Sequence, residues 1–265
     1  TIFYTSGTTG RPKGAQLTHR GSVHNILHLA FFTMAGAVAA SKAAADAGAD
    51  ADAGAGSGEE RQLVYMAPTP LFHVTACNCL LHPCTLAGGR LVFLHKWDAG
   101  RALELIEREG VTAVSGVPTM SRELLAHPDW ATRDTSSLTG LGGGGAPLQP
   151  DLVEKIDSSL AKGAPATGYG LTETSGIVSA STGRFYVDKP ASCGRVVPTL
   201  DAKLVAADGT EVPPGSDEVG ELCVRGPVVV KGYLNRPDAT AESIPEGWFH
   251  TGDIARIDSD GFVYI

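Results

Sequence analysis

Near its start the chain carries the run Tyr4-Thr5-Ser6-Gly7-Thr8-Thr9-Gly10-Arg11-Pro12-Lys13-Gly14. Glycine lets a backbone adopt positive φ and approach a ligand closely, and successive free N–H groups in such a turn form a concave anion site. The hydroxyl side chains add hydrogen-bond donors, and Arg11 and Lys13 add positive charge. The run therefore predicts a loop that binds a polyphosphate, with the rest of the fold arranged around it.

The spacing of this run differs from the best-known phosphate-binding motifs. A Walker P-loop has a glycine, four residues and then Gly-Lys-Ser/Thr. Counted from Gly7, the required glycine position is occupied by Pro12, and Lys13 is followed by Gly14. The dinucleotide fingerprint Gly-x-Gly-x-x-Gly does not fit either. The simpler alternative is a Ser/Thr/Gly surface loop that binds nothing.

Two further motifs follow predicted strands. The first is Leu141-Gly142-Gly143-Gly144-Gly145-Ala146-Pro147-Leu148. Its glycines either let a flat ligand lie against the backbone or form a flexible turn. The second is Thr167-Gly168-Tyr169-Gly170-Leu171-Thr172-Glu173-Thr174. A tyrosine ring can stack on a purine, and an adjacent hydroxyl and carboxylate can hold a phosphate oxygen and its magnesium ion.

A fourth motif lies near the C-terminal end of the sequence, Gly247-Trp248-Phe249-His250-Thr251-Gly252-Asp253-Ile254-Ala255. The carboxylate of Asp253 suits the two hydroxyls of a ribose, as the acidic ribose ligand of dinucleotide folds does. The alternative interpretation is a turn aspartate that follows a glycine.

Histidine and cysteine cluster in two places. His24 and His28 are four residues apart on a predicted helix, a spacing that would suit a metal ion. His73, Cys77, Cys79, His82 and Cys84 form a dense second cluster. This cluster has no Cys-x-x-Cys pair, and its segment is typical of an apolar helix, so packing is favoured over zinc binding.

The composition places further limits on function. Hydrophobic residues make up 43% and charged residues 19% of the 265 residues, as in an ordinary soluble globular protein. The formal net charge of −8 argues against non-specific nucleic-acid binding. Five cysteines are too few for a disulfide scaffold and fit a reducing compartment, so we expect a cytoplasmic location. No apolar run reaches the roughly 18 residues of a membrane span, and no transmembrane segment is expected.

The pattern of strands and helices predicts an α/β fold. Short apolar strands at 63–66, 90–94 and 111–115 alternate with helices at 99–109, 119–126 and 150–160, which indicates a mainly parallel sheet with flanking helices. We divide the sequence into the phosphate loop and following helix (1–42), a flexible low-complexity insertion (43–60), an α/β subdomain (61–185) and a β-rich, distorted-barrel subdomain (186–265). The first helix is expected from Leu17 to about Ala45 with Thr18 as its N-cap. In the last subdomain, 219–225 and 228–230 are predicted as strands. Both ends fall inside apparent strands, so we expect an internal fragment.

The four motifs, in this order, resemble the core of the adenylate-forming superfamily, which contains acyl-CoA synthetases, luciferases and adenylation domains of peptide synthetases. Pro70-Leu71-Phe72-His73 and Gly116-Val117-Pro118-Thr119 are most similar to fatty-acid and aryl-acid CoA ligases. Gly220-Glu221-Leu222, Gly226-Pro227 and Gly232-Tyr233-Leu234 resemble a further block of the same superfamily. The resemblance implies part of the N-terminal domain of an acyl-CoA synthetase-like ligase. Such an enzyme uses ATP and Mg²⁺ to convert a carboxylic acid to acyl-AMP, and then forms a thioester with coenzyme A. A homodimer is possible.

The resemblance also implies roles for individual residues. The nucleotide-binding residues would be Thr5, Ser6, Gly7, Thr8, Thr9, Gly10, Lys13, Gly145, Ala146, Pro147, Tyr169, Gly170, Thr172 and Asp253. The acyl pocket would be formed by His73, Val117, Gly142, Gly143 and Gly144. Lys13, Thr172, Glu173 and His73 would be catalytic, and Glu173 would bind the magnesium ion.

Three alternatives remain open at this point. An amino-acid adenylation domain would pass its product to a carrier protein, a luciferase-like oxygenase shares the first half-reaction, and a non-catalytic module would only bind nucleotide. The family also places an arginine beyond the last strand and a catalytic lysine on a C-terminal lid domain, which this sequence does not reach; Arg256 lies too early. We therefore expect the 265-residue chain alone to bind ATP weakly and to adenylate hardly at all.

Overall fold

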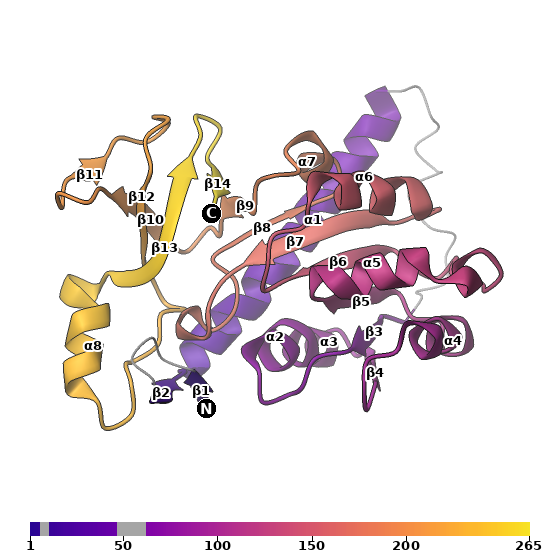
Figure 1. Cartoon of the computed structure of the whole chain (residues 1–265), viewed down its shortest axis with the longest axis horizontal. Helices are drawn as coiled ribbons and strands as arrows, with labels where there is room; N and C mark the ends of the chain where they lie inside the picture. The colour runs from indigo at the N-terminus through magenta and orange to yellow at the C-terminus, as the bar shows by residue number, and fades with distance from the viewer. Residues whose placement is uncertain (6–10, 47–61) are drawn as a thin grey trace.

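The computed structural model describes residues 1–5, 11–46 and 62–265 (Figure 1). The predicted phosphate-contacting residues Ser6, Gly7, Thr8, Thr9 and Gly10 lie outside the described residues, as does most of the predicted insertion at 43–60. Most described strands belong to one twelve-stranded sheet with the order β11-β10-β12-β13-β14-β9-β8-β7-β6-β5-β3-β4.

One half of the sheet is parallel, as the alternation of strands and helices predicted. It contains β3 (Val64–Ala67), β4 (Arg90–Phe93), β5 (Ala113–Gly116), β6 (Gly140–Gly144) and β7 (Ala164–Tyr169). The helices of this half are α2 (Val74–Ala76), the π-helix η2 (Cys77–Leu81), α3 (His82–Leu86), α4 (Ala99–Glu109), α5 (Pro118–Ala126) and α6 (Pro150–Ser159). The predicted boundaries of the last three helices agree with these to within one residue.

Helix α4 shows why these boundaries could be predicted. The Asp98 carboxylate accepts a hydrogen bond from the Arg101 N–H at 2.7 Å, and Gly110 ends the helix with a φ of 63°. These are the usual start and stop signals of a helix. Its buried face, which includes Leu103 and Ile106, packs in the core of this half with Leu124, Leu141 and Ile156 from neighbouring elements.

The other half of the sheet is antiparallel. It contains β8 (Ser179–Thr182), β9 (Gly194–Val196), β10 (Asp201–Val205), β11 (Glu211–Val212), β12 (Gly220–Arg225), β13 (Phe249–Ile257) and β14 (Phe262–Tyr264). The described strands leave β11 at the edge of an open arrangement, where the sequence led us to expect a distorted barrel. The α/β class, with a β-rich second part, is confirmed. Short helices accompany this half: η4 (Thr172–Thr174), α7 (Arg184–Asp188), α8 (Pro237–Ser243) and η5 (Pro245–Gly247).

The predicted strand at 228–230 is wrong, because the chain turns there instead. Pro227 cannot donate a ladder hydrogen bond, and Gly226 has a φ of 158°. The turn still buries Val228 and Val230 completely or nearly so. The apolar residues of this run therefore predicted its burial correctly, but they did not predict its backbone conformation.

A separate two-stranded sheet carries the ends of the predicted phosphate loop. Strand β1 (Ile2–Thr5) pairs with β2 (Lys13–Gln16), and Thr5 lies opposite Lys13. Strand β2 was not predicted, but α1 (His19–Asp46) follows it and begins two residues after the predicted helix start at Leu17. The predicted cap is confirmed, since Thr18 Oγ1 accepts from the Gly21 N–H at 2.9 Å.

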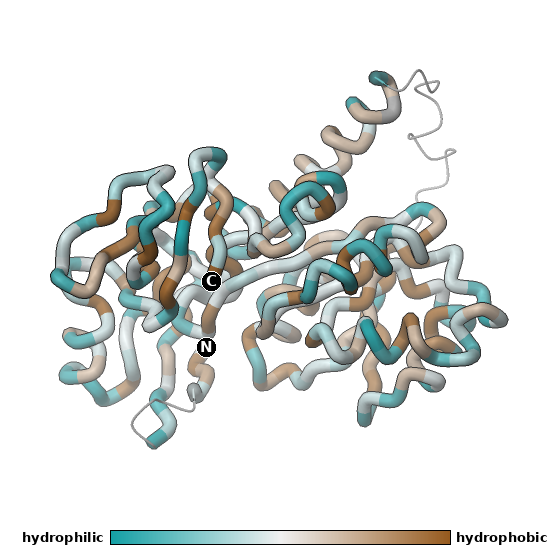
Figure 2. Tube along the Cα trace, turned by 45° about the horizontal axis from the view of Figure 1, so that its top comes forward, coloured by the Kyte–Doolittle hydropathy of each residue, from teal (hydrophilic) through white to brown (hydrophobic). Residues whose placement is uncertain are grey.

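Helix α1 passes between the two halves, where it contacts η2 and α3 as well as β8 and α7, and its C-terminal end projects beyond the sheet (Figures 1 and 2). It packs against β8, while five large apolar side chains on another face are exposed: Val23, Leu27, Phe31, Met34 and Val38. By length and composition alone, the stretch His19–Ala43 is sufficient to cross a membrane, contrary to the sequence expectation. The helix of a soluble core can pass the same test.

The histidines of α1 pack against the chain rather than forming a ligand group. His28 is 2% exposed, and its Nε2 lies 2.6 Å from Thr199 Oγ1. His24 Nδ1 lies 3.3 Å from the same oxygen. Burial, and to a lesser extent the neighbouring His24, lowers the pKa of His28 from 6.5 to about 4. His28 is therefore neutral in the folded protein at neutral pH.

This burial predicts a pH-dependent contribution to stability. The unfolded chain protonates His28 near pH 6.5, whereas the folded chain does so only near pH 4, so stability is lost as the pH falls through that window. The decrease in the free energy of unfolding that is due to His28 should reach roughly 3 kcal/mol at most. Urea unfolding between pH 7.5 and pH 4 should show a shallower pH dependence in His28→Gln than in the parent. The exposed His95→Gln should leave the profile unchanged; an unchanged profile in His28→Gln would contradict the assignment.

Candidate active site

A cavity of about 660 Å³ opens where the parallel strands end. Its lining combines residues from β1, the β3–α2 connection, β6 and the η4 segment. The sequence-predicted residues among them are Thr5, His73, Gly142, Gly143, Gly144, Gly145, Gly170, Thr172 and Glu173. Ligands in open α/β sheets bind outside the carboxyl ends of the strands. The structure brings these residues to one cavity, and their roles stay predictions.

The other predicted residues described by the structure do not line this cavity: Lys13, Val117, Ala146, Pro147, Tyr169 and Asp253. Val117 is nevertheless close, because a Cβ atom built on Gly145 would lie 3.9 Å from its Cγ1. Tyr169 and Asp253 contact each other, and Lys13 lies on β2 opposite Thr5. Their roles as nucleotide ligands stay predictions.

The glycine run is required first by the sheet itself. A Cβ on Gly142 would lie 1.9 Å from Ala166 O on β7, and one on Gly143 would lie 1.8 Å from Gly116 O on β5. Both residues have φ values, 159° and 153°, that L-residues rarely adopt. The sequence interpretation assigned these glycines to a ligand surface. They do line the cavity, but neighbouring backbone already excludes any side chain there.

Glu173 is a nearly buried carboxylate on η4, only 8% exposed. Its Oε1 accepts a hydrogen bond from the Tyr233 hydroxyl at 2.8 Å. Within the described ranges, no lysine, arginine or histidine forms an ion pair with it. A buried charge without a cationic partner is costly, and oxygen ligands of this kind are those that magnesium prefers. The donor set therefore fits a divalent cation completed by substrate oxygens.

Tyr169 and Asp253 form a second tyrosine–carboxylate pair. The Tyr169 hydroxyl donates to Asp253 Oδ2 at 2.6 Å. Burial, followed by this hydrogen bond, raises the pKa of Tyr169 far above its usual value, so the phenol remains a donor. The hydrogen bond sets the orientation of the Asp253 carboxylate, with one oxygen already occupied.

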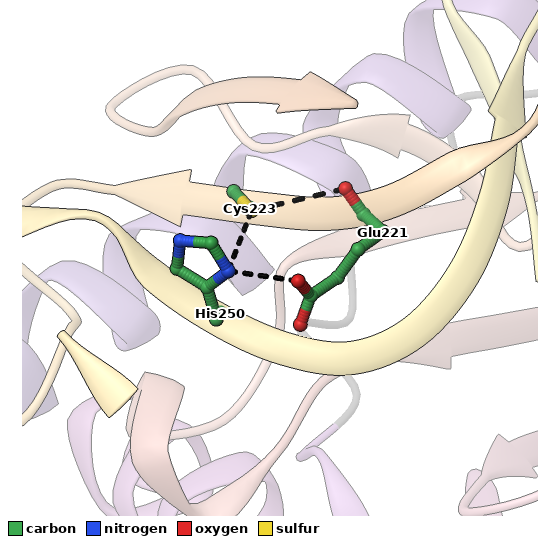
Figure 3. Close-up of side chains that lie close together, drawn as sticks. All are labelled: Glu221, Cys223 and His250. Atoms are coloured by element: carbon green, nitrogen blue, oxygen red, sulfur yellow. Dashed lines mark hydrogen bonds and ion pairs between the residues drawn. The ribbon is translucent and has the colours of Figure 1, made fainter. Parts of the chain in front are cut away.

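Glu221 holds an irregular stretch of β13 that carries Asp253. Glu221 Oε2 accepts from His250 Nδ1 at 2.8 Å (Figure 3), and Oε1 accepts from the Gly252 N–H at 3.0 Å. Cys223 Sγ lies 3.5 Å from the same His250 nitrogen, and burial, with the charge of Glu221, raises the pKa of Cys223 to about 11. The register of β12 and β13 shifts here, and Gly252 has a φ of 78°, a left-handed conformation that glycine adopts without strain.

These three side chains lie close enough to hold a metal ion, since their ligand atoms are within 4.8 Å of one another. However, both Glu221 oxygens and the His250 nitrogen already satisfy one another or the backbone. We therefore assign the cluster to positioning the stretch of β13 around Gly252. The sequence motif Gly220-Glu221-Leu222 belonged to a recognised block, but nothing in the local sequence indicated that Glu221 contacts Gly252.

His73 is exposed at the cavity and caps α2. Its Nδ1 accepts from the Thr75 N–H at 3.2 Å, so the neutral ring carries its proton on Nε2. This arrangement keeps His73 on the lining and leaves the protonated nitrogen available to a ligand.

The family of the chain follows from a comparison with known proteins. The family of AMP-binding enzymes matches residues 1–234. The chain belongs to this family. The match includes the cavity, Glu173 and Tyr233, and it ends before β13, the strand that carries Asp253.

Individual relatives support this assignment to the AMP-binding family. A feruloyl-CoA synthase from an Amycolatopsis species is 40% identical over 267 residues, covering 100% of this chain and 48% of that protein. A long-chain-fatty-acid–CoA ligase from Escherichia coli O6:H1 is 38% identical over 267 residues, which cover 100% of this chain and 43% of that protein. The solved structure of o-succinylbenzoate coenzyme A synthetase from Bacillus subtilis with ATP and magnesium is 29% identical with a TM-score of 0.78. The match covers 100% of this chain and 49% of that chain. The chain thus spans about half the length of the curated relatives it matches.

Sequence reasoning missed a buried asparagine network in this AMP-binding enzyme. Asn25 and Asn78 are 0% and 1% exposed. Asn25 donates to Asn78 O at 2.9 Å and accepts from the Ile177 N–H at 2.9 Å, while Asn78 donates to Ser175 O at 2.7 Å. The network ties α1 and η2 to the segment just after Glu173. A buried asparagine at a helical apolar position is the signal that could have revealed it.

The glycine run supplies a direct test of the site's backbone. Gly142→Ala should lower the free energy of unfolding by about 3 kcal/mol or more, because the new methyl group meets Ala166 O and the backbone is already strained for an L-residue. Gly140→Ala, on the same strand, should change it by less than about 1 kcal/mol, since the nearest atom lies 3.6 Å away. Urea denaturation measures both, and equal effects would contradict this account.

Proposed function

We propose that this chain forms the ATP- and acid-binding core of an ATP-dependent acid–CoA ligase. The observation that carries the proposal is the common cavity of Thr5, the glycine run and Thr172–Glu173, which are far apart in the sequence. Similarity to feruloyl-CoA synthase and to long-chain-fatty-acid–CoA ligase supports it. The proposed cofactor is Mg²⁺, with ATP and coenzyme A as co-substrates.

The proposed reaction has two steps. A carboxylate oxygen of the acid attacks the α-phosphorus of ATP, the new C(O)–O–P bond forms, and the α–β phosphoanhydride breaks to release pyrophosphate. The thiol of coenzyme A then attacks the acyl carbon as its proton is lost to solvent, and AMP leaves. The first step brings two anions together, so positioning and charge stabilisation are the main demands on the protein.

The proposed residue roles follow from these demands. Lys13 and Thr5 would hold the β- and γ-phosphates together with the loop residues 6–10. Thr172 would contact the α-phosphate, and Glu173 would hold Mg²⁺, which neutralises phosphate charge when bound. Asp253 would bind the ribose and Tyr169 would flank the adenine. His73, exposed on the cavity lining, would border the acid carboxylate and the approaching thiol.

The proposed substrate is a fatty or aryl acid. The lining is largely apolar and includes Leu29, Phe72, Leu80 and Ile177. Among its described residues the one acidic side chain is Glu173, which leaves no separate carboxylate for the ammonium group of an amino acid. This favours a fatty or aryl acid over the alternative of an amino-acid adenylation domain.

The location and assembly of the protein stay proposals as well. Five free cysteines support a reducing, cytoplasmic environment. A homodimer remains a prediction without support from a described contact.

Acid-dependent exchange of pyrophosphate into ATP tests the proposed function. Exchange should be measured on this chain and on the longest natural chain that contains it, with fatty, aryl and amino acids. Glu173→Ala should reduce acid-dependent exchange by about 100-fold or more, because it removes the buried carboxylate assigned to Mg²⁺. Glu154→Ala, an exposed carboxylate on α6, should leave it unchanged. ATP binding without exchange for any acid, in both chains, would instead favour a nucleotide-binding module.

A further inference from the structure

Tyr233 is a buried tyrosine that contacts both charged groups assigned to ATP and its cation. It is 6% exposed and lies between β2 and η4. Its hydroxyl donates to Glu173 Oε1 at 2.8 Å. The Lys13 ammonium lies 4.7 Å from the centroid of its ring, within the range of a cation–π interaction. One side chain thus connects the lysine of the phosphate loop with the proposed magnesium ligand.

The hydrogen bond leaves half of the Glu173 carboxylate available. Among the described residues, Oε1 is bound by Tyr233 and Oε2 has no hydrogen-bond partner. A fixed donor on one oxygen orients the other oxygen without neutralising the carboxylate.

The backbone fixes the position of Tyr233 independently of its side chain. The Leu234 N–H donates to Gly14 O at 2.8 Å, and the Gln16 N–H donates to Gly232 O at 2.9 Å. Segment 231–234 therefore extends the β1–β2 sheet, next to the strand that carries Lys13. The Tyr233 N–H donates to Thr240 Oγ1 at 2.9 Å, and the Val230 N–H donates to Glu173 O at 2.9 Å. The segment that carries the ring is therefore anchored to β2 and to η4 and is not a free loop.

We propose that Tyr233 is a positioning residue that makes Lys13 and Glu173 act as one unit. Its hydroxyl orients Glu173 toward a divalent cation, and its ring holds Lys13 beside the phosphates of the nucleotide. This inference rests on the proposed function, since it assumes that the site binds ATP with a divalent cation. The sequence placed Tyr233 in a recognised block without a role, because its partners lie 60 residues away and on the opposite strand of a small sheet.

Two substitutions separate the two contacts. Tyr233→Phe keeps the ring and removes the hydroxyl, whereas Tyr233→Leu removes both. Titration calorimetry should compare the affinity of each variant of this chain for ATP in the presence of Mg²⁺ and in the presence of EDTA. Tyr233→Phe should lose about 10-fold in affinity with Mg²⁺ and less than about 2-fold without it. Tyr233→Leu should lose affinity in both conditions. Tyr264→Phe is the matched control, because its hydroxyl donates to a different carboxylate, that of Asp258, at 3.1 Å.

Thermal unfolding of the ligand-free chain provides a readout that does not depend on nucleotide. Tyr233→Phe should lower the Tm of the parent by about 3 °C or more, because it leaves Glu173 without a donor. In the Glu173→Ala background the same substitution should lower the Tm by less than half as much, since the pair is already broken. Equal shifts in the two backgrounds would overturn the pairing.

The outcomes distinguish this inference from the proposed function. If Tyr233→Phe binds ATP in the presence of Mg²⁺ as tightly as the parent does, the positioning role of Tyr233 is contradicted, while the proposed function is not. An equal loss with and without Mg²⁺ also contradicts it, because a general structural defect would have that effect. Failure of the parent to bind ATP at millimolar concentration contradicts the proposed function, and with it the nucleotide role of Tyr233.

Discussion

The site depends on one buried charge. Glu173 is almost excluded from solvent, and the described side chain that hydrogen-bonds it is the neutral hydroxyl of Tyr233. A carboxylate in such surroundings is stable only when its position is fixed and its charge can be compensated by hydrogen-bond donors or a cation. Three contacts fix it: the Val230 N–H on its carbonyl, Tyr233 on its side chain, and the asparagine network on the segment that follows.

A second tyrosine–carboxylate pair repeats this arrangement. The Tyr169 hydroxyl donates to Asp253, and Glu221 accepts from the N–H of Gly252, the residue before Asp253 on β13. In both places a tyrosine donor occupies one carboxylate oxygen. Both tyrosines have their pKa raised by burial, so they donate throughout the physiological pH range. The two carboxylates most important to the proposed chemistry are therefore oriented before any ligand binds, which reduces the cost of reorganisation on binding.

Much of the fold could be predicted because its signals are local. The alternation of apolar runs with helices gave the parallel half, and Asp98 and Gly110 marked the ends of α4. Strand β2 was missed because it is only four residues long and lies within the motif region. The run at 228–230 was misassigned because an apolar run reports burial, whereas Gly226 and Pro227 decided the direction of the backbone. Val117 and Tyr169 were predicted to line the site but do not line the cavity, because their position relative to it depends on how the strands pack.

The sequence by itself determined the chemistry of the four motifs. These are the cations and glycines of the first motif, the glycine run of the second, the Thr172–Glu173 pair of the third and Asp253 in the fourth. These properties belong to residue types and short spacings. Only the tertiary structure decided which groups meet. Glu173 finds Tyr233 at a separation of 60 residues, Gly252 finds Glu221 at 31 and Asn25 finds Asn78 at 53. Such pairs leave no periodic pattern in the sequence, because they are set by sheet register and by the packing of distant segments around a buried charge.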